Sequence, residues 1–508
     1  MSKFLYKNRT IIFILIIAFL FRFIWLKTTI ERDEGIFGSQ SLTLFGKKYL
    51  LFTNKPIILL YIYWFFTKYF ENSVIYVRIF NNLLFFISTI FLYIFTKKIY
   101  DKKIAFYSAL FYIILANLPA LEGPLAMSES LALLPQMLFA YFLFLYITSN
   151  KKSFFILSAL FLIMCILIRY NFIYLILFML LILKIYNKKI KDELFIFTSL
   201  TLFLFLALNI LALKNPKMIY DFYRFTLVSI YNYIYSQFSN TVPMQHLFFI
   251  LLQSSFFSLL SILGMIFIST KNNKENYKLN EQFDLFILIW FGINLLSLYK
   301  TAFGHNFLPL IQPTSVLSAY AFEKLKKLNK KFIKVILFLI LLIFFLTGYF
   351  LSILQHPNYN IRYNMFQWDY SDYESFEQQI ELSNLVKNNS KNDDNIIYFG
   401  WDGSIYWLTK KINAFPMEKL SCTQLNVSRE FHKKILAEEY PYEDKNKKTK
   451  DSLFELFKKI DPKFIIISKK YSLDCNFAKN LLNFAETNNY EKINIKNFLI
   501  YYNKNKQK

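Results

Sequence analysis

Residues 153–183 read SFFILSALFLIMCILIRYNFIYLILFMLLIL, two strongly apolar runs separated only by Arg169, Tyr170 and Asn171. A helix needs roughly 20 apolar residues to cross a bilayer, and each of these runs is shorter than that. The polar break is therefore either a turn between two short helices or a bend in one longer helix. The two alternatives place every later loop on opposite sides of a membrane, so this stretch decides the topology.

Apolar runs of the same kind fill the chain up to about Ile353. The 508-residue chain is 55% hydrophobic and its mean hydropathy is +0.33, whereas soluble domains are roughly 45–50% apolar. We therefore predict a polytopic α-helical membrane protein with about eleven transmembrane helices. The predicted spans lie near residues 10–28, 75–96, 104–120, 130–148, 154–168, 171–186, 194–213, 246–269, 283–299, 303–322 and 333–353.

The positive charges of the loops indicate the orientation. With the N-terminus in the cytoplasm, basic clusters fall in the even-numbered connections, as the positive-inside rule requires. The first run lacks a small-residue cleavage site, so we expect a retained anchor. An odd number of spans then places residues 356–508 outside, provided that the Arg169 break is an outside turn. The clusters are Lys97, Lys98, Lys102 and Lys103; Lys151 and Lys152; Lys184, Lys188, Lys189 and Lys191; Lys271, Lys274 and Lys278; and Lys324, Lys326, Lys327, Lys330 and Lys331.

The composition changes near Gln355, after which the sequence is typical of a soluble domain. We predict a transmembrane domain over residues 1–355 and a small extracytoplasmic α/β domain over residues 356–508. Cys422 and Cys475 either form a disulfide in an oxidising compartment or are two unrelated thiols. Expected strands are Ile396 to Gly400, Phe464 to Ser468 and Phe498 to Tyr502, and expected helices are Leu453 to Ile460 and Phe477 to Ala485.

The net charge of +25 does not indicate nucleic-acid binding, because the cations lie in short loops between apolar segments. The sequence has no CxxC pair or Cys/His cluster, and the first outside loop has no DxD motif. We therefore expect neither a cofactor nor an essential metal. No internal repeat is apparent, which disfavours a secondary transporter.

Ionisable residues gather at the predicted outer face. Burying such groups at membrane depth is costly, so they indicate a functional site. Simpler interpretations stay open: Lys55 can reach along the membrane surface, Arg78 can anchor its helix, and His305 can be structural. The candidates are Asp33 and Glu34 after the first span, Lys55 in the first outside loop, Arg78 at the start of the second span, Glu129 at the start of the fourth, Arg169 at the break and His305 at the start of the tenth.

These residue types suit transfer of a sugar from a lipid phosphate. One carboxylate can accept the proton of an acceptor hydroxyl. Cations such as Lys55, Arg78 and His305 can hold a phosphate, which leaves without being protonated. Two carboxylates without a phosphate site would indicate hydrolysis instead.

The order of these motifs resembles that of the GT-C membrane glycosyltransferases, above all the protein O-mannosyltransferases and the bacterial lipid A aminoarabinose transferases. Asp33-Glu34-Gly35 matches the acidic motif of the family's first loop. NKPIILLY at 54–61 is similar to its KPP segment, with Ile57 in place of the second proline. Further similarities are VRIFNNLL at 77–84 to its arginine-bearing second helix, GHNFLPLIQP at 304–313 to the late helix whose basic residue meets the lipid phosphate, and YFGWDGSIYWLTKK at 398–411 to the extracytoplasmic domain of bacterial members.

The resemblance implies a role for each residue. Asp33 would be the catalytic base, and Glu34 would orient the site, in part by pairing with Arg78. Lys55 and His305 would bind the donor phosphate, and Arg169 would face the cavity. Glu129 would be the acid of the second outside loop, with Glu122 as the alternative.

The resemblance also implies an activity and its partners. The enzyme would transfer a sugar from a polyprenyl-phosphate donor to an acceptor lipid, glycan or protein by an inverting single displacement. It would act at the outer face of a cell membrane, most simply a bacterial inner membrane. Two alternatives are a lipid-linked glycan ligase or polymerase of the same fold, and a non-enzymatic lipid transporter or flippase.

Overall fold

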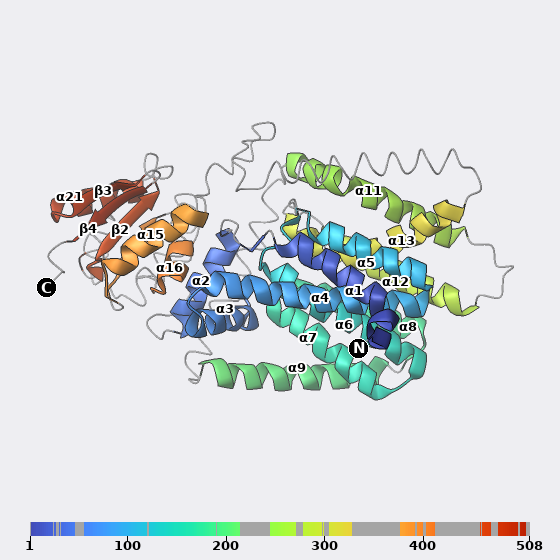
Figure 1. The fold of residues 1–508 in the computed structure, drawn as a ribbon. Coiled ribbons are helices and arrows are strands. Elements are labelled where there is room, and N and C mark those ends of the chain that lie inside the picture. The colour runs from blue at the N-terminus through green and yellow to red at the C-terminus, as the bar shows by residue number, and fades with distance from the viewer. Residues whose placement is uncertain are drawn as a thin grey trace.

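The computed structural model describes most of the predicted membrane domain and the sheet near the C-terminus (Figure 1). The first part of the chain forms a helical bundle, and the last part forms a small sheet with its own helices. The described residues are 2–23, 25–26, 30, 32–45, 55–118, 121–188, 190–213, 244–270, 278–296, 298, 304–327, 376–391, 394–399, 403–411, 458, 460–468, 476–495 and 498–503.

A helix lies at each predicted span that falls within the described residues. The span predicted near 333–353 lies outside them, so the count of eleven stays a prediction. The helices are α1 (Ser2–Phe23), α4 (Ser73–Ile99), α5 (Lys102–Ala116), α6 (Ser128–Ser149), α7 (Lys152–Ile168), α8 (Leu175–Ile185), α9 (Ile190–Leu213), α11 (Met244–Ser269), α12 (Lys278–Leu296) and α13 (Ile311–Lys327).

Among the described residues, α4 and α6 are each long and apolar enough, by length and composition, to cross a membrane. Aromatic side chains fill the space between helices: the Phe95 ring of α4 contacts the rings of Phe144 in α6 and Trp290 in α12. Trp290 and Phe95 are fully buried. The apolar core therefore lies inside the bundle. Shorter apolar helices span Ile57–Tyr69, Lys152–Ile168, Tyr170–Ile185, Phe257–Ser269 and Phe283–Leu296.

The polar break at Arg169, Tyr170 and Asn171, within residues 153–183, is a turn between two helices. Arg169 ends α7 in an extended conformation, with φ −152° and ψ 117°. A 3-10 helix, η2 (Tyr170–Tyr174), follows and leads into α8. The structure thus has the two-helix alternative and not one bent helix.

The first predicted outside loop contains two helices that the sequence patterns did not indicate, α2 (Arg32–Phe45) and α3 (Ile57–Tyr69). Pro56 directly precedes α3. Proline lacks a backbone N–H, but no hydrogen bond is lost at this position because the first N–H groups of a helix have no partner within it. The Phe37 and Tyr63 rings pack edge to face, 5.5 Å apart, and join the two helices. Helix α2, packed against α3, places Asp33 and Glu34 at one end of the bundle.

The sheet has four strands in the order β1-β2-β4-β3. β1 and β2 are parallel and the other pairs are antiparallel. The strands predicted at the positions of β1, β2 and β4 are present, whereas β3 was not predicted. The predicted helix from Leu453 to Ile460 lies largely outside the described residues, as do Cys422, Cys475 and the predicted domain boundary. The elements are α15 (Phe376–Asn388), β1 (Ile396–Phe399), α16 (Ser404–Thr409), β2 (Phe464–Ser468), α21 (Asn476–Thr487), β3 (Glu491–Ile495) and β4 (Phe498–Tyr502).

The four strands with α15, α16 and α21 are here named the sheet unit. Helix α16 packs against α2 and joins the sheet unit to the helical bundle (Figure 1). The backbones approach so closely at Gly35 and Gly403 that a Cβ on Gly403 would lie 2.7 Å from the Gly35 carbonyl oxygen. A Cβ on Gly38 would lie 2.2 Å from the Trp407 ring. Trp407 is fully buried, and its Nε1–H donates a 2.7 Å hydrogen bond to Thr67 Oγ1 in α3. Glycine is therefore required at these crossing points.

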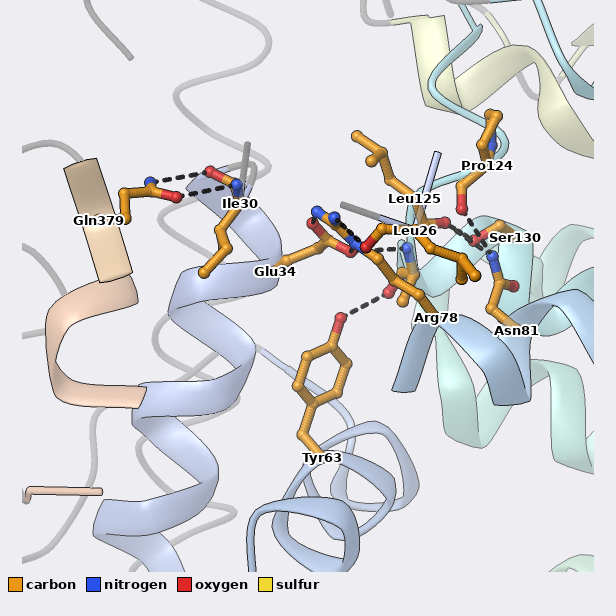
Figure 2. Close-up of polar contacts among 11 residues, drawn as sticks. Leu26, Ile30, Glu34, Tyr63, Arg78, Asn81, Pro124, Leu125, Ser130 and Gln379 are labelled. Carbon is orange, nitrogen blue, oxygen red and sulfur yellow. Dashed lines mark hydrogen bonds and ion pairs between the residues drawn. The ribbon is translucent and has the colours of Figure 1, made fainter. Parts of the chain in front are cut away.

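A second connection joins α15 to the chain just before α2. The Gln379 side-chain amide accepts a 3.1 Å hydrogen bond from the Ile30 backbone N–H and donates a 3.4 Å one to the Ile30 carbonyl (Figure 2). Gln379 is buried, so both halves of its amide are satisfied away from water. The sheet unit thus holds the segment three residues before Asp33.

Candidate active site

A buried ion pair joins α2 to α4. Arg78 donates from Nε to Glu34 Oε1 at 3.1 Å and from Nη2 to Glu34 Oε2 at 2.6 Å (Figure 2). Both side chains are 1% exposed or less. Arg78 Nη1 also donates to the Leu26 carbonyl at 3.2 Å. This two-bond geometry is the strongest form of an arginine–carboxylate contact and sets the position of α2 on the bundle.

The loop of residues 121–127, here named the central loop, is held by several helices at once. Glu34 Oε1 accepts a 2.9 Å hydrogen bond from the Ala126 N–H, and the Tyr63 hydroxyl donates a 2.6 Å bond to the Ala126 carbonyl. Asn81 Nδ2 donates to the Leu125 carbonyl at 2.9 Å (Figure 2). The central loop is therefore fixed from α2, α3 and α4 together.

Glu122 in the central loop is strained and faces His305. Its φ of 53° lies in the left-handed region, which costs free energy for a residue other than glycine. Glu122 Oε2 lies 2.6 Å from His305 Nδ1. Next to it, a Cβ on Gly123 would lie 2.1 Å from the Ala116 carbonyl oxygen, so only glycine fits. Arg22 of α1 donates a 2.6 Å hydrogen bond to the Gly123 carbonyl.

Arg169 gathers polar groups from two elements, α6 and η3. It forms an ion pair with Glu129 in the first turn of α6. Its Nη1 donates to Ser128 Oγ at 3.0 Å and its Nη2 donates to Asn306 Oδ1 at 2.6 Å. His305 Nε2 lies 3.5 Å from Glu129 Oε1. His305 therefore lies between two carboxylates, those of Glu122 and Glu129.

The 3-10 helix η3 (Gly304–Leu310), which carries His305, is anchored from inside the bundle. Gln136 Nε2 donates to the Pro309 carbonyl at 3.0 Å and to Asn294 Oδ1 at 3.0 Å. The Tyr174 hydroxyl donates to the same Asn294 oxygen at 2.8 Å. These polar contacts join α6, α12 and η2, and they fix the position of η3 relative to all three.

Asp33 and Lys55 lie at the start of α2 and just before α3. Lys55 Nζ lies 5.1 Å from the centroid of the Phe37 ring. Phe37 is four residues after Asp33 on α2, and residues four apart are neighbours on one helix face. Lys55 therefore contacts α2 one helical turn after Asp33. Asp33 is part-exposed whereas Glu34 is fully buried, so Asp33 is the carboxylate that solvent and a substrate can reach.

The structure brings the predicted residues into two groups joined by the central loop. One group is Glu34 and Arg78, and the other is Glu129, Arg169 and His305. Glu122, which the sequence left as the alternative to Glu129, contacts the same histidine. In the described part of the chain, no group of three or more His, Cys, Asp or Glu side chains is placed to hold a metal ion.

Sequence reasoning missed the polar residues that support these groups. Asn306 contacts Arg169 across 137 positions of sequence, and Tyr63 contacts the central loop across 63 positions. Asn306 directly follows His305, and this adjacency to a candidate residue was the one available signal. Tyr63 was part of an aromatic run that had no such signal.

The fold is similar to that of two solved membrane glycosyltransferase structures. ArnT from Cupriavidus metallidurans bound to undecaprenyl phosphate is similar at a TM-score of 0.60 and 10% identity, over 97% of this chain and 98% of that chain. The Archaeoglobus fulgidus oligosaccharyltransferase complex with Zn and sulfate is similar at a TM-score of 0.58 and 11% identity, over 97% of this chain and 73% of that chain.

A family model agrees with these structures. Residues 54–213 match the family described as dolichyl-phosphate-mannose-protein mannosyltransferase, and this segment contains Lys55, Arg78, Glu129 and Arg169. No curated protein sequence matches the chain. The resemblance to the GT-C glycosyltransferases that the sequence motifs indicated is therefore confirmed.

Proposed function

We propose that the chain is a glycosyltransferase that moves a sugar from a polyprenyl-phosphate donor to an acceptor at the outer face of the membrane. The observation that carries the proposal is the set of polar contacts around the central loop, the buried Glu34–Arg78 pair on one side and Arg169 and His305 with their carboxylates on the other. The part-exposed Asp33 directly precedes Glu34 in α2. The undecaprenyl phosphate bound to ArnT, which has this fold, supports a donor of the same chemical class.

Asp33 is the residue that we assign as the base. It is part-exposed in the first turn of α2, where the helix dipole favours a negative charge. The acceptor oxygen attacks the anomeric carbon while Asp33 accepts its proton. The bond between that carbon and the phosphate oxygen breaks, and the polyprenyl phosphate leaves with the electron pair. A single displacement of this kind inverts the configuration of the sugar.

Glu34 is suited to holding the site and not to proton transfer. Both of its oxygens accept hydrogen bonds from Arg78, and one also accepts from the Ala126 N–H. A carboxylate that is buried and bonded in this way is held in one position. Glu34 therefore connects the start of α2 to the central loop, while the neighbouring Asp33 faces the substrate.

Lys55 and Arg169 supply the positive charge for the donor phosphate. Lys55 contacts α2 one turn after Asp33, which places a cation on the helix that carries the proposed base. Arg169 is part-exposed, although it contacts Glu129 and Asn306. His305 lies between Glu122 and Glu129, so it reaches a phosphate only when one of these carboxylates moves aside. Holding donor and acceptor side by side would contribute much of the rate.

Transfer of radiolabelled sugar from polyprenyl-phosphate donors, measured in membranes, tests the proposal. The native chain is compared with Asp33→Asn and with Glu71→Gln, an exposed carboxylate just after α3. We expect transfer by the native chain, loss of about a hundredfold or more in Asp33→Asn, and no change in Glu71→Gln.

Other outcomes would overturn parts of the proposal. Equal transfer by the native chain and Asp33→Asn would refute the base assignment. Transfer only from lipid-linked oligosaccharides would make the protein a ligase or polymerase. No transfer from any donor, together with movement of lipid across the membrane, would make it a flippase.

A further inference from the structure

A cavity of about 500 Å³ lies between α1 and α5, away from the candidate active site. Three cations line it: Arg9 from α1, and Lys102 and Lys103 from the start of α5. None of the residues that line the cavity is acidic. The cavity therefore concentrates positive charge where two helices meet.

The cavity lies at the opposite membrane boundary from the candidate active site. Arg78 is near the beginning of α4, which ends at Ile99, and α5 begins at Lys102. Twenty-one residues of helix are about 30 Å long, which is about the thickness of a hydrocarbon core. A ligand in this cavity is thus distinct from the sugar donor at the other end.

The one carboxylate next to the lysines in sequence is already engaged. Asp101 caps α5, and its Oδ1 accepts 2.8 Å hydrogen bonds from the Lys103 and Ile104 backbone N–H groups. A further cation lies close by, because Lys326 Nζ donates a 3.2 Å hydrogen bond to the hydroxyl of Tyr107, which lines the cavity. The local charge thus favours an anion, and a phosphate suits both lysine and arginine donors.

The walls of the cavity favour hydrocarbon. The Phe13 and Phe106 rings, one from each helix, stack with their centroids 6.3 Å apart. Phe13 also belongs to an exposed apolar face of α1 that includes Ile16 and Leu20 and is turned outward from the bundle. In a membrane this face meets the acyl chains of lipids, so the cavity is continuous with the lipid phase. A free phosphate would leave these apolar walls uncovered.

We propose that the cavity binds an anionic phospholipid. The phosphate of the headgroup lies against Arg9, Lys102 and Lys103, and an acyl chain runs along Phe13 and Phe106. Basic pockets between helices at a membrane boundary recognise anionic headgroups in this way. The site requires neither the proposed sugar transfer nor its acceptor.

Native mass spectrometry of the purified full chain in detergent tests the site. The added probes are phosphatidylglycerol, phosphatidylcholine and inorganic phosphate. The variant Lys102→Gln/Lys103→Gln is compared with Lys151→Gln/Lys152→Gln, a matched pair of exposed lysines at the start of α7. We expect bound phosphatidylglycerol on the native chain and the control, and affinity lower by roughly 20- to 30-fold in the first variant.

Three results would overturn the proposal. Equal binding of phosphatidylcholine would show that the headgroup charge is not recognised. Equal loss in the two double variants would show attraction to surface charge in general. Inorganic phosphate that competes fully with phosphatidylglycerol would show that the acyl chain contributes nothing and that the ligand is a free anion.

Discussion

Replacing Arg78 with glutamine should lower the free energy of unfolding by about 3–5 kcal/mol. The change leaves the carboxylate of Glu34 buried without the guanidinium that now contacts both of its oxygens. Breaking a buried pair on one side costs more than the pair contributes, because a desolvated charge remains. The thermal unfolding of the purified protein in detergent measures the loss.

The double variant Glu34→Gln/Arg78→Gln provides the sharpest control. The side-chain amide that replaces the Glu34 carboxylate would keep an oxygen to accept from the Ala126 N–H, and no unpaired charge would be buried. The double variant should therefore be less destabilised than the sum of the two single variants. Lys97→Gln in the last turn of the same helix changes an exposed lysine and should shift stability by less than about 0.5 kcal/mol. Additive effects of Glu34→Gln and Arg78→Gln would show that the ion pair does not join α2 to α4.

The helices of the bundle could be predicted from the sequence because lipid imposes one simple requirement. Runs such as residues 194–213 must satisfy every backbone group internally, and a helix does so within the run itself. The break at Arg169 was visible for the same reason, since a charged residue interrupts the apolar pattern. These features depend on neighbours along the chain.

Helix α2 could not be predicted, because its stability depends on distant parts of the chain. The sequence of α2, RDEGIFGSQSLTLF, contains two glycines and no clear apolar stripe. Gly35 and Gly38 permit close contact with α16, nearly 370 positions later in sequence. Residues that weaken a helix in isolation are here required for its packing.

The candidate site also has some features that could be predicted from the sequence and others that depend on contacts between distant residues. The ends of the predicted spans indicated which ionisable residues to consider together, and the pairing of Glu34 with Arg78 was expected. The sequence favoured Glu129 over Glu122, but it gave no sign that both would lie at the same histidine. Both carboxylates contact His305, across 183 and 176 positions, because the central loop and α6 reach the histidine from two directions.

Truncating Trp407 to alanine should have an effect as large as that of breaking the ion pair. The side chain is fully buried against Gly38 and lies 5.2 Å from the Tyr63 ring, centroid to centroid. Removing a buried tryptophan costs about 3–5 kcal/mol. Because α16 contacts α2, which carries Asp33 in its first turn, we also expect Trp407→Ala to lower sugar transfer. Thermal unfolding and the transfer assay measure the two effects.

Two further variants separate packing from hydrogen bonding at this contact. Trp407→Phe keeps an aromatic ring but loses the hydrogen bond to Thr67, so it should cost only about 1 kcal/mol plus a smaller packing loss. Gly38→Ala should destabilise the native chain by about 1–3 kcal/mol, because the added methyl would lie 2.2 Å from the ring. In a Trp407→Ala background the space is open, so Gly38→Ala should then cost much less. Equal costs in the two backgrounds would show that Trp407 does not occupy the surface of α2 and that the sheet unit is held elsewhere.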